Sequence, residues 1–277
     1  MIIVSQAQPD PSQLIQTWGL NNTEKEILEK MAGSEQIYSY DSFQPLRFEL
    51  KLRDELVKAA LALHRSGASF AVFSKSRCNE EYWSRTENGG FQLRPGVPPS
   101  TGIQDIFNNG REYGFECTTA VMIMCYKAIL DALDADTFNR LFPNLFLWDG
   151  YYDEDLALTK RLHADLLPGD IRYIKNPDFD PDHPEWQGEN TIYLGKGAYF
   201  GHGIGVARAD DMIRILNRKR RPGATESAYL MDEAIFPNFK HLAQYYTTPV
   251  PEPSSTGRTA QNVVVVARVG SRTYLTT

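Results

Sequence analysis

One stretch of the sequence constrains the fold more than any other. From Glu116 to Leu133 the residues carry little charge, and their apolar side chains are not confined to one face of a helical wheel. A helix that is apolar nearly all round must be covered on most sides. A chain of 277 residues can bury such a helix without a disulfide or a metal. We therefore expect this helix at the centre of a large core.

A cysteine stands where this helix should begin. The N-terminus of a helix offers free N–H groups and the positive end of the dipole, and both favour a thiolate, which is the nucleophilic form. Cys117 is therefore a candidate nucleophile; the alternative is a small buried side chain. Cys125 lies among apolar residues in the middle of the helix, and Cys78 lies in a polar stretch. We expect the first in the core and assign no role to the second, because three cysteines do not form a disulfide framework.

Composition and motifs exclude several classes of function. The formal net charge is −6, whereas binding to nucleic acid needs a concentrated basic surface. The basic run Arg218–Arg221 is expected to be a solvated helix end, with a site for an acidic partner as the alternative. No apolar run reaches the roughly 20 residues of a membrane span, and the first residues lack the pattern of a secretory signal. No His or Cys pair has metal-ligand spacing and no nucleotide-binding loop is present. We expect cytoplasmic synthesis, no membrane, no metal and no cofactor.

Helices and antiparallel strands are predicted around the central helix. Apolar residues at three- and four-residue steps predict a helix over Phe48–Ser66, which Gly67 would end. Asn88-Gly89 is typical of a hairpin turn. Further predicted elements are strands at Glu81–Arg85, Gly90–Arg94, Ile171–Ile174, Thr191–Leu194, Tyr199–Ile204 and Val263–Val269, and helices at Thr101–Asn109 and Asp210–Asn217.

A carboxylate and a histidine lie near the two late strands. If Gly195–Ala198 closes a hairpin with a two- or four-residue loop, Leu194 pairs with Tyr199 and Thr191 with His202. Glu189 and His202 then share one face as diagonal neighbours; a three- or five-residue loop would separate them. A Cys–Glu–His set supports acyl transfer, since a carboxylic acid of raised pKa can protonate a leaving amine and later accept a proton.

Several segments match a known family in the right order. They are Phe115-Glu116-Cys117-Thr118-Thr119-Ala120, Lys175-Asn176-Pro177-Asp178-Phe179-Asp180-Pro181, Trp186-Gln187-Gly188-Glu189-Asn190, Tyr199-Phe200-Gly201-His202-Gly203-Ile204-Gly205 and Ser227-Ala228-Tyr229-Leu230. On these segments, residues 1 to about 245 resemble the bacterial spore-coat protein-glutamine γ-glutamyltransferases, the small calcium-independent transglutaminases of spore-forming bacteria.

The resemblance implies a fold and a set of roles. The fold is α+β, with a core similar to papain-like cell-wall cysteine peptidases, in which a buried helix that begins at the nucleophilic cysteine packs on an antiparallel sheet. Cys117 is implied as nucleophile, Glu189 as its principal carboxylate partner and Glu116 as a partly redundant acid or base. His202 aligns with a histidine near the catalytic centre. Gln187 stands where a basic residue is expected in relatives.

The resemblance also implies domain limits and an activity. Residues 1–246 form one catalytic domain, followed by a Pro/Ser/Thr-rich linker over 247–260 and a strand-like extension over 261–277. The expected reaction joins protein glutamine to protein lysine through a thioester with release of ammonia, in a narrow apolar channel. Trp148 and Trp186 are candidate lining residues, but ordinary core packing is the preferred prediction for both. The expected substrates are spore-coat proteins, and the expected final location is the spore coat. The alternatives are a cysteine peptidase or amidase of the same fold, and a non-catalytic coat scaffold.

Overall fold

The computed structural model describes residues 1–253, 265–269 and 272–276. Helices and strands are interspersed along the chain, as expected for a mixed fold. The α-helices of this part are α1 (Pro11–Trp18), α2 (Asn22–Gly33), α3 (Phe43–Ser66), α4 (Pro99–Asn108), α5 (Cys117–Ala132), α6 (Ala135–Leu141), α7 (Ala209–Asn217) and α8 (Phe239–Leu242).

The strands form one large sheet and several small ones. The large sheet is antiparallel, with the order β12-β11-β10-β9-β14-β8, and β13 pairs with β9. Its strands are β8 (Thr159–Leu162), β9 (Ile171–Lys175), β10 (Gly188–Gly195), β11 (Ala198–Gly201), β12 (Gly205–Arg208), β13 (Tyr229–Leu230) and β14 (Glu233–Phe236). The small sheets pair β1 (Ile2–Val4) with β2 (Tyr38–Tyr40), β3 (Ser69–Phe70) with β6 (Gly114–Phe115), and β5 (Phe91–Leu93) with both β4 (Trp83–Arg85) and β7 (Phe146–Leu147). The pairs β1–β2 and β3–β6 are parallel, while the other strand pairs described are antiparallel.

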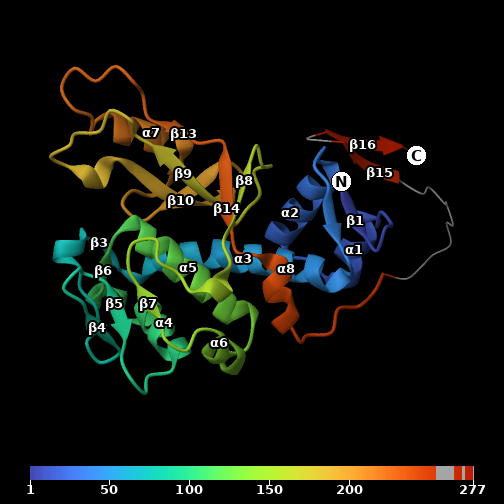
Figure 1. Ribbon diagram of the computed structural model, residues 1–277, viewed down its shortest axis with the longest axis horizontal. Coiled ribbons are helices and arrows are strands. Elements are labelled where there is room, and N and C mark those ends of the chain that lie inside the picture. The colour runs from blue at the N-terminus through green and yellow to red at the C-terminus, as the bar shows by residue number, and fades with distance from the viewer. Residues whose placement is uncertain (254–264, 270–271, 277) are drawn as a thin grey trace.

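The predicted central helix lies where the sequence places it. In Figure 1 the long helix α3 and helix α5 run beneath the large sheet, and α4 and α6 lie on the side away from the sheet. Nearly every side chain of α5 after Thr118 is buried, including Lys127, which pairs with Asp131. The helix is therefore covered by α3, by the sheet and by α4 and α6.

Helix α3 is longer than predicted. It begins at Phe43 rather than Phe48 and ends as expected at Gly67, which has φ +86°. The prediction started late because Pro45 and the polar residues around it look unlike a helix interior, although proline is tolerated in a first turn. The β4–β5 hairpin matches its prediction, with Trp83 opposite Leu93 and Arg85 opposite Phe91.

The predicted register of the β10–β11 hairpin is wrong. The turn at Lys196-Gly197 has two residues with positive φ, which suits a tight hairpin. Leu194, however, is an extra residue on β10 between the Tyr193–Tyr199 and Gly195–Ala198 pairs. This β-bulge shifts the partners by one, so Thr191 pairs with Gly201 and not with His202.

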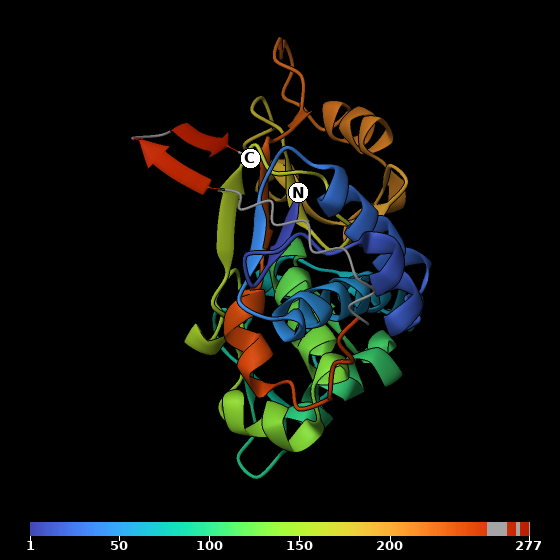
Figure 2. The ribbon, with the colours of Figure 1, turned by 90° about the vertical axis from the view of Figure 1, so that its right-hand side faces the viewer.

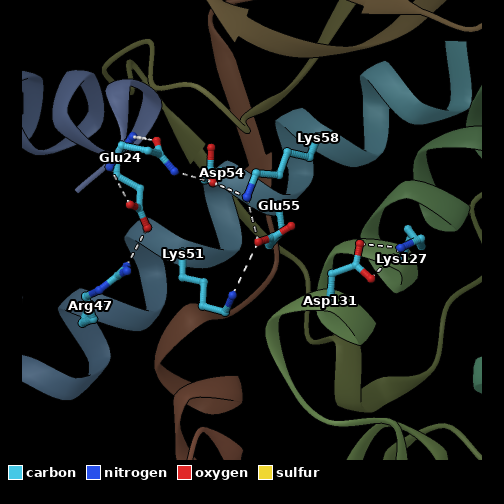
Figure 3. A network of polar contacts seen from close by, with 9 residues as sticks. Glu24, Arg47, Lys51, Asp54, Glu55, Lys58, Lys127 and Asp131 are labelled. Atoms are coloured by element: carbon cyan, nitrogen blue, oxygen red, sulfur yellow. Dashed lines mark hydrogen bonds and ion pairs between the residues drawn. The ribbon is translucent and has the colours of Figure 1, made fainter. Parts of the chain in front are cut away.

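An N-terminal layer of α1, α2, β1 and β2 packs against α3. Figure 3 shows the ion pair that joins α3 to α2, between Arg47 and Glu24, and the pairs of Lys58 with Asp54 and Glu55 within α3. Deeper in this layer, Arg53 of α3 lies between Glu49 and Asp170 and is itself almost fully buried. Charged side chains thus hold this layer to α3 and to the loop before β9.

The C-terminal segment leaves the body of the protein after α8. Residues 247–253 return toward α1, where Trp18 Nε1 donates a hydrogen bond to the carbonyl of Pro251. Within the predicted strand Val263–Val269, the first two residues lie outside the described part of the chain, and the rest form β15 (Val265–Val269). That strand pairs antiparallel with β16 (Arg272–Thr276). Figure 2 shows this hairpin standing apart from the large sheet.

In the described residues, no helix is both long enough and apolar enough to span a membrane.

Candidate active site

Cys117 is the first residue of α5, and its thiol faces strand β10. The side-chain amide of Asn190 donates to the sulfur, with 3.6 Å between Nδ2 and Sγ. Burial, followed by the nearby Glu189 carboxylate, raises the pKa of the Cys117 thiol to about 11, and the two N–H groups of Asn190 act in the opposite direction. The resting thiol is therefore protonated at neutral pH and needs a base before it can attack a carbonyl.

Glu189 of β10 is a buried carboxylate without a cationic partner in the described residues. It is 3% exposed, and Oε1 accepts a hydrogen bond of 3.1 Å from the main-chain N–H of Gly203. A Cβ atom at Gly201 would lie 2.7 Å from this side chain, and one at Gly203 would lie 3.0 Å from it, so the two glycines give the carboxylate its space. Burial raises the pKa of Glu189 to about 7. It can therefore both accept and return a proton near neutral pH.

Glu116 lies immediately before α5 in the N-cap position, without a side-chain capping bond. Its carboxylate is half-buried, and burial together with the charges of Asp149 and Glu185 raises its pKa to about 7. A carboxylate that caps a helix would have its pKa lowered instead. Glu116 is thus a second group that can exchange protons close to Cys117.

His202 has a different environment from the one expected. Its ring stacks on Phe115, with 4.6 Å between centroids and 17° between planes, and lies 6.5 Å from the ring of Phe70. Burial lowers the pKa of His202 to about 4, so the ring is neutral at neutral pH. In the described residues it makes no hydrogen bond to Glu189 or Cys117. The bulge in β10 explains this, because Gly203 rather than His202 reaches the Glu189 carboxylate.

The thiol opens on a cleft of about 450 Å³. Three carboxylates, Glu116, Asp149 and Glu185, line it together with Phe70, Phe73 and Tyr173, and no lysine or arginine among the described residues does. A second cavity of about 300 Å³ is mostly apolar, and Thr118 and Asn190 border both spaces. Thr118 and Asn190, the neighbours of Cys117, therefore lie between the two spaces.

The two candidate tryptophans do not line either space, in agreement with the preferred prediction of core packing. Trp148 packs on Phe73 and Phe146, and Trp186 lies under the ammonium of Lys219. Gln187, by contrast, does border the cleft. The rings at the cleft come from elements before α5 and from β9, whose positions depend on tertiary packing that sequence patterns do not reveal.

The other cysteines and the basic run match their predictions. Cys125 is fully buried in α5, and Cys78 lies away from the site with its sulfur 3.9 Å from the carbonyl of Trp83. Arg221 pairs with Asp178, and Arg220 donates to the carbonyls of Asn217 and Glu226 at the end of α7. In the part of the chain that the structure describes, no three His, Cys, Asp or Glu side chains are grouped as metal ligands.

Sequence reasoning missed three polar residues of the site: Asn190, Asp149 and Glu185. Asn190 directly follows Glu189, so a correct register for β10 would have placed its side chain near Cys117. Asp149 has φ +45°, a conformation common for Asp in turns, and its Oδ1 accepts a hydrogen bond from Thr118. Its sequence context offered no other signal.

Comparisons with known proteins agree on one family. The family model described as protein-glutamine gamma-glutamyltransferase matches residues 1–246. Proteins with that name from Bacillus cereus are 44% and 46% identical over 251 and 253 residues, about 91% of each chain. One from Bacillus anthracis is 46% identical over 250 residues, 90% of each chain. A solved transglutaminase from Geobacillus stearothermophilus, without C-terminal extension, is 51% identical with a TM-score of 0.72, and the match covers 74% of this chain and 99% of that one.

Proposed function

Because the chain belongs to the protein-glutamine gamma-glutamyltransferase family, we propose that it joins proteins through ε-(γ-glutamyl)lysine isopeptide bonds, with Cys117 as nucleophile and Glu189 as principal proton carrier. The observation that carries the assignment is the neighbourhood of the sulfur. A protonated thiol at a helix N-terminus lies beside a buried carboxylate whose pKa of about 7 fits proton exchange.

The first half of the reaction forms the thioester. Glu189 takes the proton of the Cys117 thiol, and the thiolate attacks the side-chain amide carbon of a protein glutamine. A C–S bond forms while the electron pair of the carbonyl moves to oxygen. When this intermediate collapses, the C–N bond breaks and Glu189 returns the proton to nitrogen, which leaves as ammonia.

The second half transfers the acyl group to an amine. A neutral lysine amine attacks the thioester carbon, and a carboxylate accepts its proton. The C–S bond then breaks, and the proton returns to sulfur, which regenerates the thiol. Glu116 is placed to assist, because it borders the same cleft and exchanges protons in the same pH range. The carboxylates of the cleft favour the approach of a cationic side chain.

We also propose that the fold has a papain-like core. A helix that begins with a cysteine and packs on a strand of an antiparallel sheet is similar to the core of the papain-like cell-wall cysteine peptidases, and in this chain Glu189 lies on that strand. The mostly apolar cavity beside the thiol supports exclusion of water from the thioester, which an amine-selective enzyme needs.

We further propose that the protein substrates are spore-coat proteins and that the enzyme, after synthesis in the cytoplasm, acts in the spore coat. The support for this is the resemblance of the sequence motifs and the origin of the relatives in Bacillus species. The reactive residues on the partners are glutamine and lysine side chains.

One assay separates the proposal from its rivals. The protein is incubated with a glutamine-rich acceptor protein and a labelled primary amine, beside Cys117→Ala and the matched control Cys78→Ala. We expect covalent amine incorporation by the wild type and the control and none by Cys117→Ala. Deamidation or cleavage without incorporation would indicate a hydrolase. The absence of any Cys117-dependent product would indicate a scaffold protein.

A further inference from the structure

Among the described residues, the side chain that hydrogen-bonds to the sulfur of the nucleophile is that of Asn190, not Glu189. Its Nδ2 atom lies 3.6 Å from the Cys117 sulfur, and the sulfur is the acceptor of this amide in the described residues. A thiol sulfur is a weak acceptor. A hydrogen bond from the amide to this sulfur therefore adds little to the stability of the fold. This suggests that the amide has a stronger acceptor at another stage of the reaction.

The register of β10 leaves the main-chain N–H of Asn190 free for the same purpose. At the two ends of the β9–β10 pairing, the N–H of Asn176 donates to the carbonyl of Gln187, and the N–H of Tyr193 donates to the carbonyl of Asp170. Main-chain groups alternate in direction along a strand, so the odd-numbered residues of β10 form their hydrogen bonds with β9. Asn190 therefore directs its N–H to the other side. On that side β10 pairs with β11, but the last pair is Thr191–Gly201, so the pairing stops one residue short of Asn190.

The sulfur lies on this open side. Both the main-chain and the side-chain N–H groups of Asn190 act on the Cys117 thiol, and both favour its negative form. Asn190 also borders both the acidic cleft and the apolar cavity, as Thr118 does. An acyl group bound to sulfur therefore lies beside Asn190 whichever space it entered from.

We propose that Asn190 is a catalytic residue whose side-chain amide and main-chain N–H hold the oxyanion of both tetrahedral intermediates. The inference rests on the proposed role of Cys117. Negative charge develops on the substrate oxygen close to the buried Glu189, where fixed neutral donors stabilise it and no cation among the described residues lines the cleft. The free N–H groups at the start of α5 add to this field.

Two reactions of the same thiol test the role. Acylation by a p-nitrophenyl ester passes through an oxyanion, whereas alkylation by iodoacetamide does not. For Asn190→Ala we expect the burst of nitrophenol and the kcat of amine incorporation to fall about 100-fold. The alkylation rate should change far less, and KM should change little.

The control and a second variant keep the test decisive. Thr191 follows Asn190 on β10, and Thr191→Val removes a buried hydrogen bond to the carbonyl of Arg172 on β9. It should lower the melting temperature and leave both reactions of the thiol unchanged. If Asn190→Ala does not fold, Asn190→Asp keeps the shape and removes the amide donor. Acylation within threefold of the wild type, or equal loss of acylation and alkylation, would overturn the proposal. A wild type that forms the acyl-enzyme but incorporates no amine would refute the proposed transferase and leave the role of Asn190 standing.

Discussion

Two regions of the molecule bury carboxylates in opposite ways. Where α3 meets the N-terminal layer and the loop before β9, Glu49 and Asp170 flank Arg53 at 2.9 and 2.7 Å, and Tyr40 donates to Glu49. In the catalytic region, the Glu189 carboxylate accepts one hydrogen bond, from the main-chain N–H of Gly203, and pairs with no cation among the described residues. All of these acids are less than 10% exposed. In the first arrangement a cation and hydrogen-bond donors face the buried acids, whereas in the second the acid has no cation and its pKa lies near neutrality.

The difference shows how burial acquires a function. A buried acid with a cation and several donors stays ionised and holds elements together. A buried acid without that compensation is destabilised when ionised, and its pKa moves toward neutrality, where catalysis can use it. Four substitutions test this contrast, and they are described from the largest expected effect to the smallest.

The largest effect is expected on catalysis at the uncompensated acid. Glu189→Gln keeps the shape and removes the exchangeable proton, so kcat for amine incorporation should fall by about 10²- to 10⁴-fold. Glu116→Gln, at the second acid of the site, should cost about tenfold or less because Glu189 still carries the proton. Steady-state kinetics at pH 8 measure both, and a Glu189→Gln enzyme at full rate would contradict the assignment.

The next effect is on stability at the compensated cluster. Arg53→Met leaves Glu49 and Asp170 buried without their cation, and breaking a buried pair in this way costs about 3–5 kcal/mol. Urea unfolding should show this loss, while the folded fraction keeps the kcat of the wild type. A loss below about 1 kcal/mol would mean that the cluster does not fix the layer.

The third effect is a gain in stability rather than a loss. The pKa of Glu189 is about 7 in the fold, against an ordinary value of 4.5. Below pH 4.5 the carboxyl is protonated in both states, so it contributes nothing. As pH rises to 7 only the unfolded state releases the proton, and stability falls. Glu189→Gln should therefore raise the free energy of unfolding by up to about 3 kcal/mol at pH 8.5 and leave it unchanged at pH 4. Urea titrations at the two pH values measure this, and an equal effect at both would contradict the cause.

The smallest effect is expected at Lys58 in Figure 3, whose side chain is exposed although its partners are buried. Lys58 contacts Asp54 and Glu55, but its side chain is 55% exposed. Lys58→Met should cost at most about 1 kcal/mol, and the cost should shrink in high salt because screening already weakens the pairs. Urea unfolding at low and high salt checks this beside Arg53→Met, and a salt-independent loss would be evidence of another cause.

Local patterns in the sequence were enough to predict part of this structure. The apolar helix and Cys117 at its start follow from the composition of α5, and the β4–β5 hairpin follows from Asn88-Gly89. The register of β10 could not be predicted, because a one-residue bulge at Leu194 depends on how the strand packs. The partners of Arg53 were also hidden, since Asp170 lies 117 residues away along the chain.

The enclosure of α5 also has a consequence for the choice of substrate. The nucleophile lies at the end of a helix that is buried on nearly all sides, so the thiol is not free to move out to meet a glutamine. The glutamine must instead extend into the cleft, and only a loop, a chain end or a locally unfolded segment has that reach. A partner protein would become reactive where its own structure loosens, so the mobility of the partner would decide where cross-links form.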